Sequence, residues 1–138
     1  MLSKKVLNSL LKEPQVSLEN QEAYKKILVN NNINVNSDFY EFMFKYGGDI
    51  DGTLGYMMNV PEDLSQKEHS VTFSLHKNEG VPDNFISLFD YEYEDYLLYN
   101  KNDGSVIMIE GGNMQKLSNN NYDKKWNDFN SFLEDFLP

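Results

Sequence analysis

The sequence contains no cysteine and no arginine. Without cysteine, the chain forms no disulfide bond, no thiolate metal site and no cysteine nucleophile, which favours a reducing compartment. Without arginine, it lacks the side chain that most often contacts phosphate or guanine through two hydrogen bonds. Because the net charge is also -10, the sequence argues against a nucleic-acid or nucleotide partner.

Long apolar segments are missing as well. No stretch approaches the roughly 18 apolar residues of a membrane span. Residues 1–11 carry two lysines but no apolar run of the length found in signal peptides. We therefore expect a cytoplasmic protein without a membrane partner. The aromatic content of 14% is high for a disordered chain, and 138 residues fit one domain, 1–138, with its own core.

Acidic residues are concentrated in the middle of the chain. Residues 49–110 hold thirteen acidic residues against three lysines, whereas residues 1–35 hold three acidic residues against five lysines. Such a distribution repels nucleic acid and anionic membranes and attracts cationic partners. The middle of the chain is therefore the place to look for a binding surface.

One short segment of this region mixes acidic and aromatic residues most densely. Its members are Asp90, Tyr91, Glu92, Tyr93, Glu94, Asp95 and Tyr96. Clustered carboxylates steer basic partners, and tyrosine is enriched at interface centres. We predict a partner-binding site from Asp90 to Asp95, with Tyr91 and Tyr93 as anchors. The alternative is an ordinary acidic turn with inward tyrosines, since alternate residues at a strand end face opposite ways.

Asp49 and Asp51 provide a second acidic position, and we include both in the predicted partner-binding site. Glu62 and Asp63 are the next acids along the chain. The segment from residue 48 to residue 52 resembles the start of a calcium-binding loop. However, the twelfth position counted from Asp49 is Val60, where such a loop needs a carboxylate. We therefore predict a polar turn between a helix and a strand, and no metal ion.

Patterns typical of enzymes are absent. If residues 64–75 form a helix, His69 and His76 lie two turns apart on one face, too far to share a small metal ion. The sequence contains no Gly-x-Ser-x-Gly nucleophile elbow, and no glycine-rich phosphate loop follows a predicted strand. We therefore expect no catalytic residue and no cofactor.

Apolar spacing, capping residues and turn residues predict the order of helices and strands. Three helices are expected first, over residues 3–12, 17–30 and 37–46. Strands are expected over residues 53–59, 85–89, 95–100, 105–110 and, as a short last strand, 114–117. Residues 64–75 fit both a helix and a strand, and we favour the helix. A closing amphipathic helix carries Trp126, Phe129, Leu133, Phe136 and Leu137. Helices, then a mostly antiparallel sheet, then a helix make an α+β domain.

Three passages of this sequence resemble the SUKH superfamily. The passages are NVNSDFYEFMFKYGG, VPDNFISLFDYEYEDYLLYNKNDGSVIMI and NDFNSFLEDFLP, and with their surroundings they cover most of residues 17–138. They are similar, in this order, to the family's helix ending in two small residues, its strand, acidic turn and hairpin, and its closing helix. The resemblance implies N-terminal helices, a central sheet of about four to six mostly antiparallel strands and a C-terminal helix.

The resemblance also implies a function without catalysis. The superfamily takes in a yeast cell-wall synthesis regulator and many bacterial immunity proteins of polymorphic toxin systems. Such immunity proteins bind a toxin, frequently a nuclease, inside the cell that produces it. We therefore expect a toxin domain with a basic surface as the partner. Two alternatives stay open, namely an intracellular scaffold or regulatory module and a hydrolase whose site the sequence does not reveal.

Overall fold

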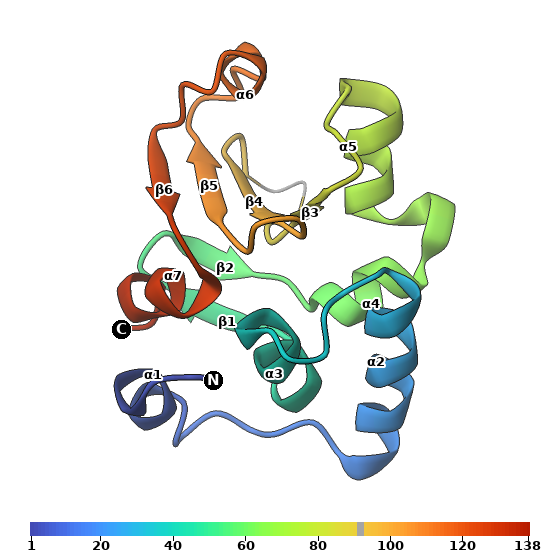
Figure 1. Cartoon of the computed structure of the whole chain (residues 1–138), viewed down its shortest axis with the longest axis vertical. Helices are drawn as coiled ribbons and strands as arrows, with labels where there is room; N and C mark the ends of the chain where they lie inside the picture. Colours follow the sequence, from blue (N-terminus) through green and yellow to red (C-terminus); the bar gives the residue numbers. More distant parts are fainter. Residues whose placement is uncertain (91–92) are drawn as a thin grey trace.

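The computed structural model describes residues 1–90 and 93–138, and it confirms an α+β fold with helices at both ends (Figure 1). The N-terminal helices are α1 (Lys4–Ser9), α2 (Leu18–Asn30) and α3 (Asp38–Lys45). The middle of the chain forms β1 (Ile50–Gly52), β2 (Gly55–Met57), α4 (Val60–Ser65), the 3-10 helix η1 (Lys67–His69) and α5 (Val71–Glu79). The remaining elements are β3 (Phe85–Ser87), β4 (Tyr96–Asn100), β5 (Val106–Ile109), α6 (Gln115–Ser118), β6 (Lys124–Trp126) and α7 (Phe129–Phe136).

Short polar side chains determine where most of the helices begin. The side-chain oxygen of each of these residues accepts a hydrogen bond from a backbone N–H in the first turn of its helix: Ser3, Ser17, Ser37, Asn59, Ser70 and Asp128. This bond satisfies a donor that the helix itself leaves without a partner. The three N-terminal helices therefore begin where the sequence predicts them.

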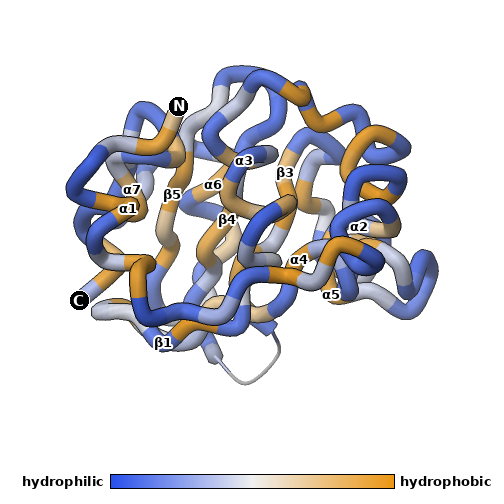
Figure 2. Tube along the Cα trace, turned by 90° about the horizontal axis from the view of Figure 1, so that it is seen from below, coloured by the Kyte–Doolittle hydropathy of each residue, from blue (hydrophilic) through white to orange (hydrophobic). Residues whose placement is uncertain are grey.

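Among the described residues, the main sheet has four antiparallel strands in the order β3-β4-β5-β6. The inner strands β4 and β5 are buried on both faces, and β5 reads as a continuous apolar run. One face packs Leu97, Tyr99, Val106 and Met108 against α3 and α7, where Phe39 stacks on Tyr99 at 3.9 Å. The other face carries Leu98, Ile107 and Ile109, which pack with Leu75, Val81 and Leu117. Figure 2 shows the apolar stretches of β4 and β5 in the middle of the molecule.

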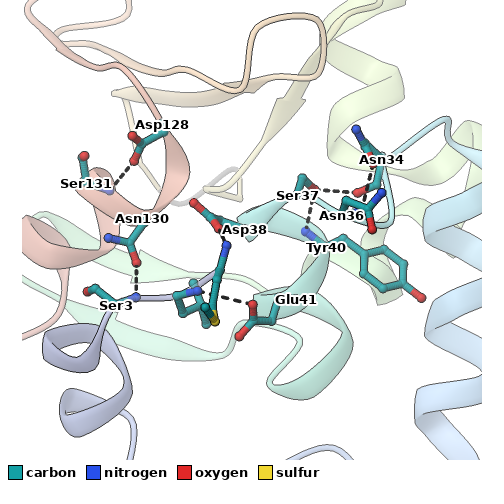
Figure 3. Close-up of polar contacts among 12 residues, drawn as sticks. Ser3, Asn34, Asn36, Ser37, Asp38, Tyr40, Glu41, Asp128, Asn130 and Ser131 are labelled. Atoms are coloured by element: carbon teal, nitrogen blue, oxygen red, sulfur yellow. Dashed lines mark hydrogen bonds and ion pairs between the residues drawn. The ribbon is translucent and has the colours of Figure 1, made fainter.

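The start of the chain is tied to two later helices (Figure 3). The N-terminal ammonium group pairs with Asp38, and the N–H of Leu2 donates to Glu41 at 3.3 Å, both on α3. The N–H of Ser3 donates to Oδ1 of Asn130 on α7 at 2.8 Å. Figure 1 accordingly shows α1, α3 and α7 grouped together beside the β1–β2 hairpin. This group closes one face of the core.

Two expectations about the second half of the chain are wrong. Residues 115–117 belong to α6 and Met114 precedes its first turn, so the expected strand is absent there; Leu117 joins the second core cluster and Met114, three residues earlier, packs against it. Trp126 lies on β6 rather than on the closing helix, where it pairs with Val106. The helix begins only at Phe129, because the side chain of Asp128 caps it.

Two expectations about the middle of the chain are also corrected. The polar turn expected over residues 48–52 is in part a strand. Residues 50–52 form β1, which pairs with β2 from Ile50 opposite Met57 to Gly52 opposite Gly55. The helix favoured over residues 64–75 is divided into the end of α4, η1 and the start of α5. The division occurs because Lys67 has a positive φ of 53° and Ser70 caps a new helix. His69 and His76 therefore lie on different elements.

Candidate partner-binding site

The structure brings the two predicted acidic groups together around Tyr56 of β2. The hydroxyl of Tyr56 donates to Oδ1 of Asp49 at 2.6 Å, and the N–H of Tyr56 donates to the hydroxyl oxygen of Tyr93 at 2.8 Å. Asp51 lies directly opposite Tyr56 in the hairpin register. The acids around residue 50 and those after residue 89 therefore share one surface, although Tyr56 and Tyr93 are 37 positions apart in the sequence.

The negative charge around Tyr56 helps to raise its pKa. It is raised from the ordinary 10.0 to about 12, first by the hydrogen bond to Asp49 and next by partial burial. The charges of Asp49, Asp51 and Asp90 raise it further. Tyr56 therefore stays protonated and keeps donating its hydroxyl hydrogen to Asp49 throughout the neutral range.

Gly48 places Asp49 at this surface. The φ of Gly48 is 111°, and a Cβ atom at this position would lie 2.2 Å from the backbone oxygen of Met58. Only glycine fits such a close approach of two backbone segments. Asp49 follows with a φ of 56°, a left-handed conformation that aspartate tolerates better than most residues. Its carboxylate is thereby held where both Tyr56 and Asn59 reach it.

On one side, the acidic surface continues toward α4. The side-chain amide of Asn59 donates to Oδ2 of Asp49 at 3.2 Å and to the hydroxyl oxygen of Tyr24 at 3.0 Å. The hydroxyl of Tyr24 in turn donates to Oε1 of Glu62 at 3.1 Å. A hollow of about 290 Å³ adjoins this network and includes Glu13 in its wall. Glu62 thus joins Asp49 through a chain of hydrogen bonds.

On the other side, the surface continues into a hollow of about 400 Å³ between α5 and the segment before β4. Asp90, Tyr93, Glu94 and Asp95 line it, together with Glu79 at the end of α5. The hydroxyl of Tyr96 donates to Oε1 of Glu79 at 2.6 Å, which is the main cause that raises the pKa of Tyr96 to about 12. We call the acids on both sides of Tyr56 the acidic band: Glu62, Asp49, Asp51, Asp90, Glu94, Asp95 and Glu79.

Lysine leaves several acids of this surface unpaired. Within residues 1–90 and 93–138, Asp49, Asp51, Glu94 and Asp95 form no ion pair with lysine within 4.0 Å, and the pairs Lys45–Glu41 and Lys116–Asp123 lie outside the acidic band. Exposed charges that close together repel one another, and a cationic partner relieves that repulsion. The acidic band is therefore suited to a partner with a basic surface.

The predicted site residues have different structural roles. Tyr93 is half-buried, with its ring 4.5 Å from Phe89, so it joins the core to the surface. Asp51 and Glu94 are exposed, and Asp95 accepts a hydrogen bond from the N–H of Gly111 at 2.9 Å. The predictions for Tyr91 and Glu92 lie outside the described residues.

Asp63, which follows Glu62 in the sequence, serves the fold rather than the acidic band. Its carboxylate accepts a hydrogen bond from the N–H of Val71 at 2.8 Å and another from Thr72 at 3.4 Å, at the start of α5. Burial raises the pKa of Asp63, and these backbone hydrogen bonds oppose the rise. Asp63 thus helps to fix the beginning of α5.

Sequence reasoning missed four residues of this site: Tyr24, Tyr56, Asn59 and Glu79. The pairing of Asp51 with Tyr56 required the β1–β2 hairpin, which the sequence analysis did not predict because it placed the turn residues Thr53 and Leu54 inside a strand over residues 53–59. Glu79 could be assigned to this site only from the position of α5 relative to Tyr96. The strand predicted over residues 53–59 was the one available signal, since a strand needs a neighbour to pair with.

Neither histidine belongs to the acidic band. Nε2 of His76 donates to the backbone oxygen of Phe85 at 2.7 Å, and His69 is exposed. In the part of the chain that the structure describes, no three His, Cys, Asp or Glu side chains lie where they could hold one metal ion. Among the same residues, no helix has the length and apolar character needed to cross a membrane.

Comparisons with models of protein families, with curated proteins and with solved structures find no match to this chain. The relation to the SUKH superfamily therefore stays a prediction from the three sequence passages.

Proposed function

We propose that this chain is a protein-binding domain that recognises a basic surface of a partner through its acidic band. One observation carries the proposal: acids from two remote segments meet around Tyr56, and no lysine pairs with Asp49, Asp51, Glu94 or Asp95 within the described residues. A surface that concentrates like charge weakens the free protein slightly. A cationic partner relieves this repulsion and is attracted to the same acids.

The same geometry indicates how such a partner binds. Long-range attraction by the exposed acids accelerates encounter, and it weakens as salt screens the charges. Tyr56 and Tyr93 hold the two acidic groups in a fixed arrangement through hydrogen bonds of 2.6 and 2.8 Å. A partner therefore meets carboxylates that are already in place, which lowers the entropic cost of binding.

Within this class, we propose an immunity protein that binds and neutralises a toxin. The three passages that resemble the SUKH superfamily support this assignment, together with the acidic band. A nuclease toxin holds phosphate in a basic cleft. Carboxylates spaced along an acidic surface can occupy that cleft in place of phosphate groups. No described feature favours the scaffold or hydrolase alternatives.

Genes for such immunity proteins typically stand beside the gene of the toxin, so the experiment takes as the partner the toxin that a neighbouring gene is expected to encode. Asp51→Lys with Glu94→Lys reverses two exposed charges of the acidic band whose side chains make no ion pair or hydrogen bond to another described residue. We expect the association rate to fall by about tenfold or more at low salt, with no loss of thermal stability. The toxin should also be less well inhibited in a growth assay.

The matched control reverses two exposed charges outside the acidic band, Glu22→Lys with Glu68→Lys. It makes the same change in net charge and should affect association much less. Equal effects of the two pairs would refute the acidic band as the binding surface. Tight binding with unchanged salt dependence in the Asp51/Glu94 variant would refute the electrostatic basis, and absence of binding to the toxin would refute the immunity assignment.

A further inference from the structure

The two outer edges of the main sheet differ. At the β3 edge, the N–H of Ser87 donates to Oγ1 of Thr72 at 3.0 Å, and His76 donates through Nε2 to the backbone oxygen of Phe85 at 2.7 Å. Both of these side chains come from α5, which lies beside β3 in Figure 1. Helix α5 therefore occupies hydrogen-bonding groups that an added strand would need.

The β6 edge is open in the described part of the chain. Strand β6 pairs with β5 on one side, and no strand of the described residues lies on its other side. A hollow of about 470 Å³ adjoins it, with Thr53 and Leu54 of the β1–β2 turn in its wall. The indole Nε1–H of Trp126 donates to Asp135 at 2.8 Å, which fixes one end of this edge.

The side chains of β6 place positive charge on both faces of the sheet. Lys124 lies opposite Met108, and Lys125 lies opposite Ile107, whose side chains belong to the two different core clusters. Side chains directly opposite one another in an antiparallel pair share a face. The two exposed lysines therefore lie on opposite faces. Trp126 lies opposite Val106, on the face of Lys124.

Neither lysine is neutralised by a close ion pair among the described residues. The pKa of Asp103 is lowered: burial opposes the shift, hydrogen bonds from Ser105 outweigh it, and the charge of Lys125 adds to the lowering. Two copies of β6 placed side by side would bring lysines against lysines, which disfavours pairing between copies of the chain. A strand with carboxylates opposite the two lysines has the complementary charge.

We propose that β6 accepts an additional antiparallel strand from a partner protein, in the form of an extended segment with an apolar residue followed by two acidic residues. The apolar residue lies opposite Trp126, and the two acids lie opposite Lys125 and Lys124 on the two faces. Backbone hydrogen bonds to β6 supply affinity, and the two lysines supply selectivity. This surface is separate from the acidic band, and the inference does not depend on the proposed function.

The test uses two blocked hexapeptides as probes, Thr-Val-Glu-Glu-Val-Thr and its counterpart Thr-Val-Lys-Lys-Val-Thr. Amide NMR spectra of the full chain are recorded during titration to roughly 2 mM peptide, which detects binding in the millimolar range. We expect the glutamate peptide to shift the signals of residues 53–54 and 124–126 and to slow hydrogen exchange there. At residues 124–126, the lysine peptide should bind about tenfold more weakly or not at all, even where it also binds the acidic band.

The charge-reversed variant, Lys124→Glu with Lys125→Glu, should exchange the preference between the two peptides. The neutral variant, Lys124→Gln with Lys125→Gln, provides a second measure that does not add like charge at the edge. It should weaken binding of the glutamate peptide by about tenfold and lower its salt dependence.

Four outcomes overturn the inference. They are no shift at residues 124–126, shifts centred elsewhere, equal binding of both peptides, and a preference that the charge reversal leaves unchanged. Sedimentation of the wild-type chain tests whether a second copy of the chain, rather than a partner protein, binds this edge. Concentration-dependent dimerisation that the two glutamates abolish would assign this edge to a second copy of the chain instead.

Discussion

At the scale of single residues, hydrogen bonds from tyrosine to carboxylate organise the acidic band. Tyr56 donates to Asp49, Tyr96 to Glu79 and Tyr24 to Glu62. In each pair, a neutral donor holds an acid in position without removing its charge. A lysine in the same place would fix the carboxylate but would also neutralise it. The choice of tyrosine therefore preserves the negative field that the proposed function requires.

The Tyr56–Asp49 hydrogen bond predicts a stability change at high pH. Because folding raises the pKa of Tyr56 from 10.0 to about 12, the unfolded chain loses this proton at lower pH than the folded chain. The contribution of this hydrogen bond is therefore complete below about pH 10 and is lost as the pH rises through about 12. Tyr56→Phe should lower the free energy of unfolding at neutral pH by about 1 kcal/mol.

Urea unfolding at a series of pH values measures both effects. Tyr56→Phe should lose less stability than the wild type between neutral and alkaline pH. The control is Tyr122→Phe, which removes an exposed hydrogen bond to Asn120, only two positions away in the sequence. Identical neutral stability and identical alkaline curves for the two variants would show that the Tyr56–Asp49 bond contributes nothing.

At the scale of elements, α5 connects the acidic band to the main sheet. Its end contributes Glu79 to the acidic band, and its inner face contributes Leu75 to the second core cluster. Its beginning is held by the Ser70 cap and by the partly buried carboxylate of Asp63. Movement of α5 would therefore disturb the sheet edge and the acidic surface together.

Thr72→Val tests the contact between α5 and β3. This change keeps the size of the side chain but removes the Oγ1 acceptor of the Ser87 N–H, and both residues are buried. A buried donor without a partner costs about 1–3 kcal/mol, so we expect a loss of about 2 kcal/mol in the free energy of unfolding. Thr53→Val, which removes an exposed hydroxyl bonded to the backbone oxygen of Asp135, should cost less.

Urea unfolding compares the two variants, and hydrogen exchange at Ser87 locates the effect. Faster exchange of the Ser87 amide in Thr72→Val, without a similar change in β5, would agree with the prediction. A variant as stable as the wild type would mean that α5 does not cover the β3 edge through Thr72.

At the scale of the whole molecule, charge is distributed unevenly over a chain with net charge -10. The acidic band groups many of these charges, so the free protein bears a repulsion that its partner removes. Asp51→Lys with Glu94→Lys should therefore raise the free energy of unfolding at low salt by up to about 1 kcal/mol while it weakens partner binding. Added salt should reduce the gain in stability.

Thermal and urea unfolding at several salt concentrations measure this difference. The control is again Glu22→Lys with Glu68→Lys, which changes the net charge equally but acts outside the acidic band. We expect a smaller gain for the control. A destabilised Asp51/Glu94 variant, or equal gains for both pairs, would contradict a concentration of repulsion in the acidic band.

Local signals made most of the fold predictable. The caps at Ser3, Ser17 and Ser37 precede apolar residues at helical spacing, and the three N-terminal helices form there. Strands β4 and β5 and the turn between them were also predicted. Local signals failed at residues 114–117 and at Trp126, since short apolar patterns fit both a helix and a strand. The neighbours of these residues in the tertiary structure decide between the two.

By itself, the sequence determined the α+β class and the acidic character of the middle of the chain. These properties depend on composition, on capping residues and on apolar spacing over a few positions. Only the tertiary structure decided that Asp49 and Asp51 share a surface with Asp90, and that α5 covers one sheet edge while β6 leaves the other open. The reason is physical: contacts between residues 37 positions apart depend on how helices and sheet pack, which no local pattern encodes.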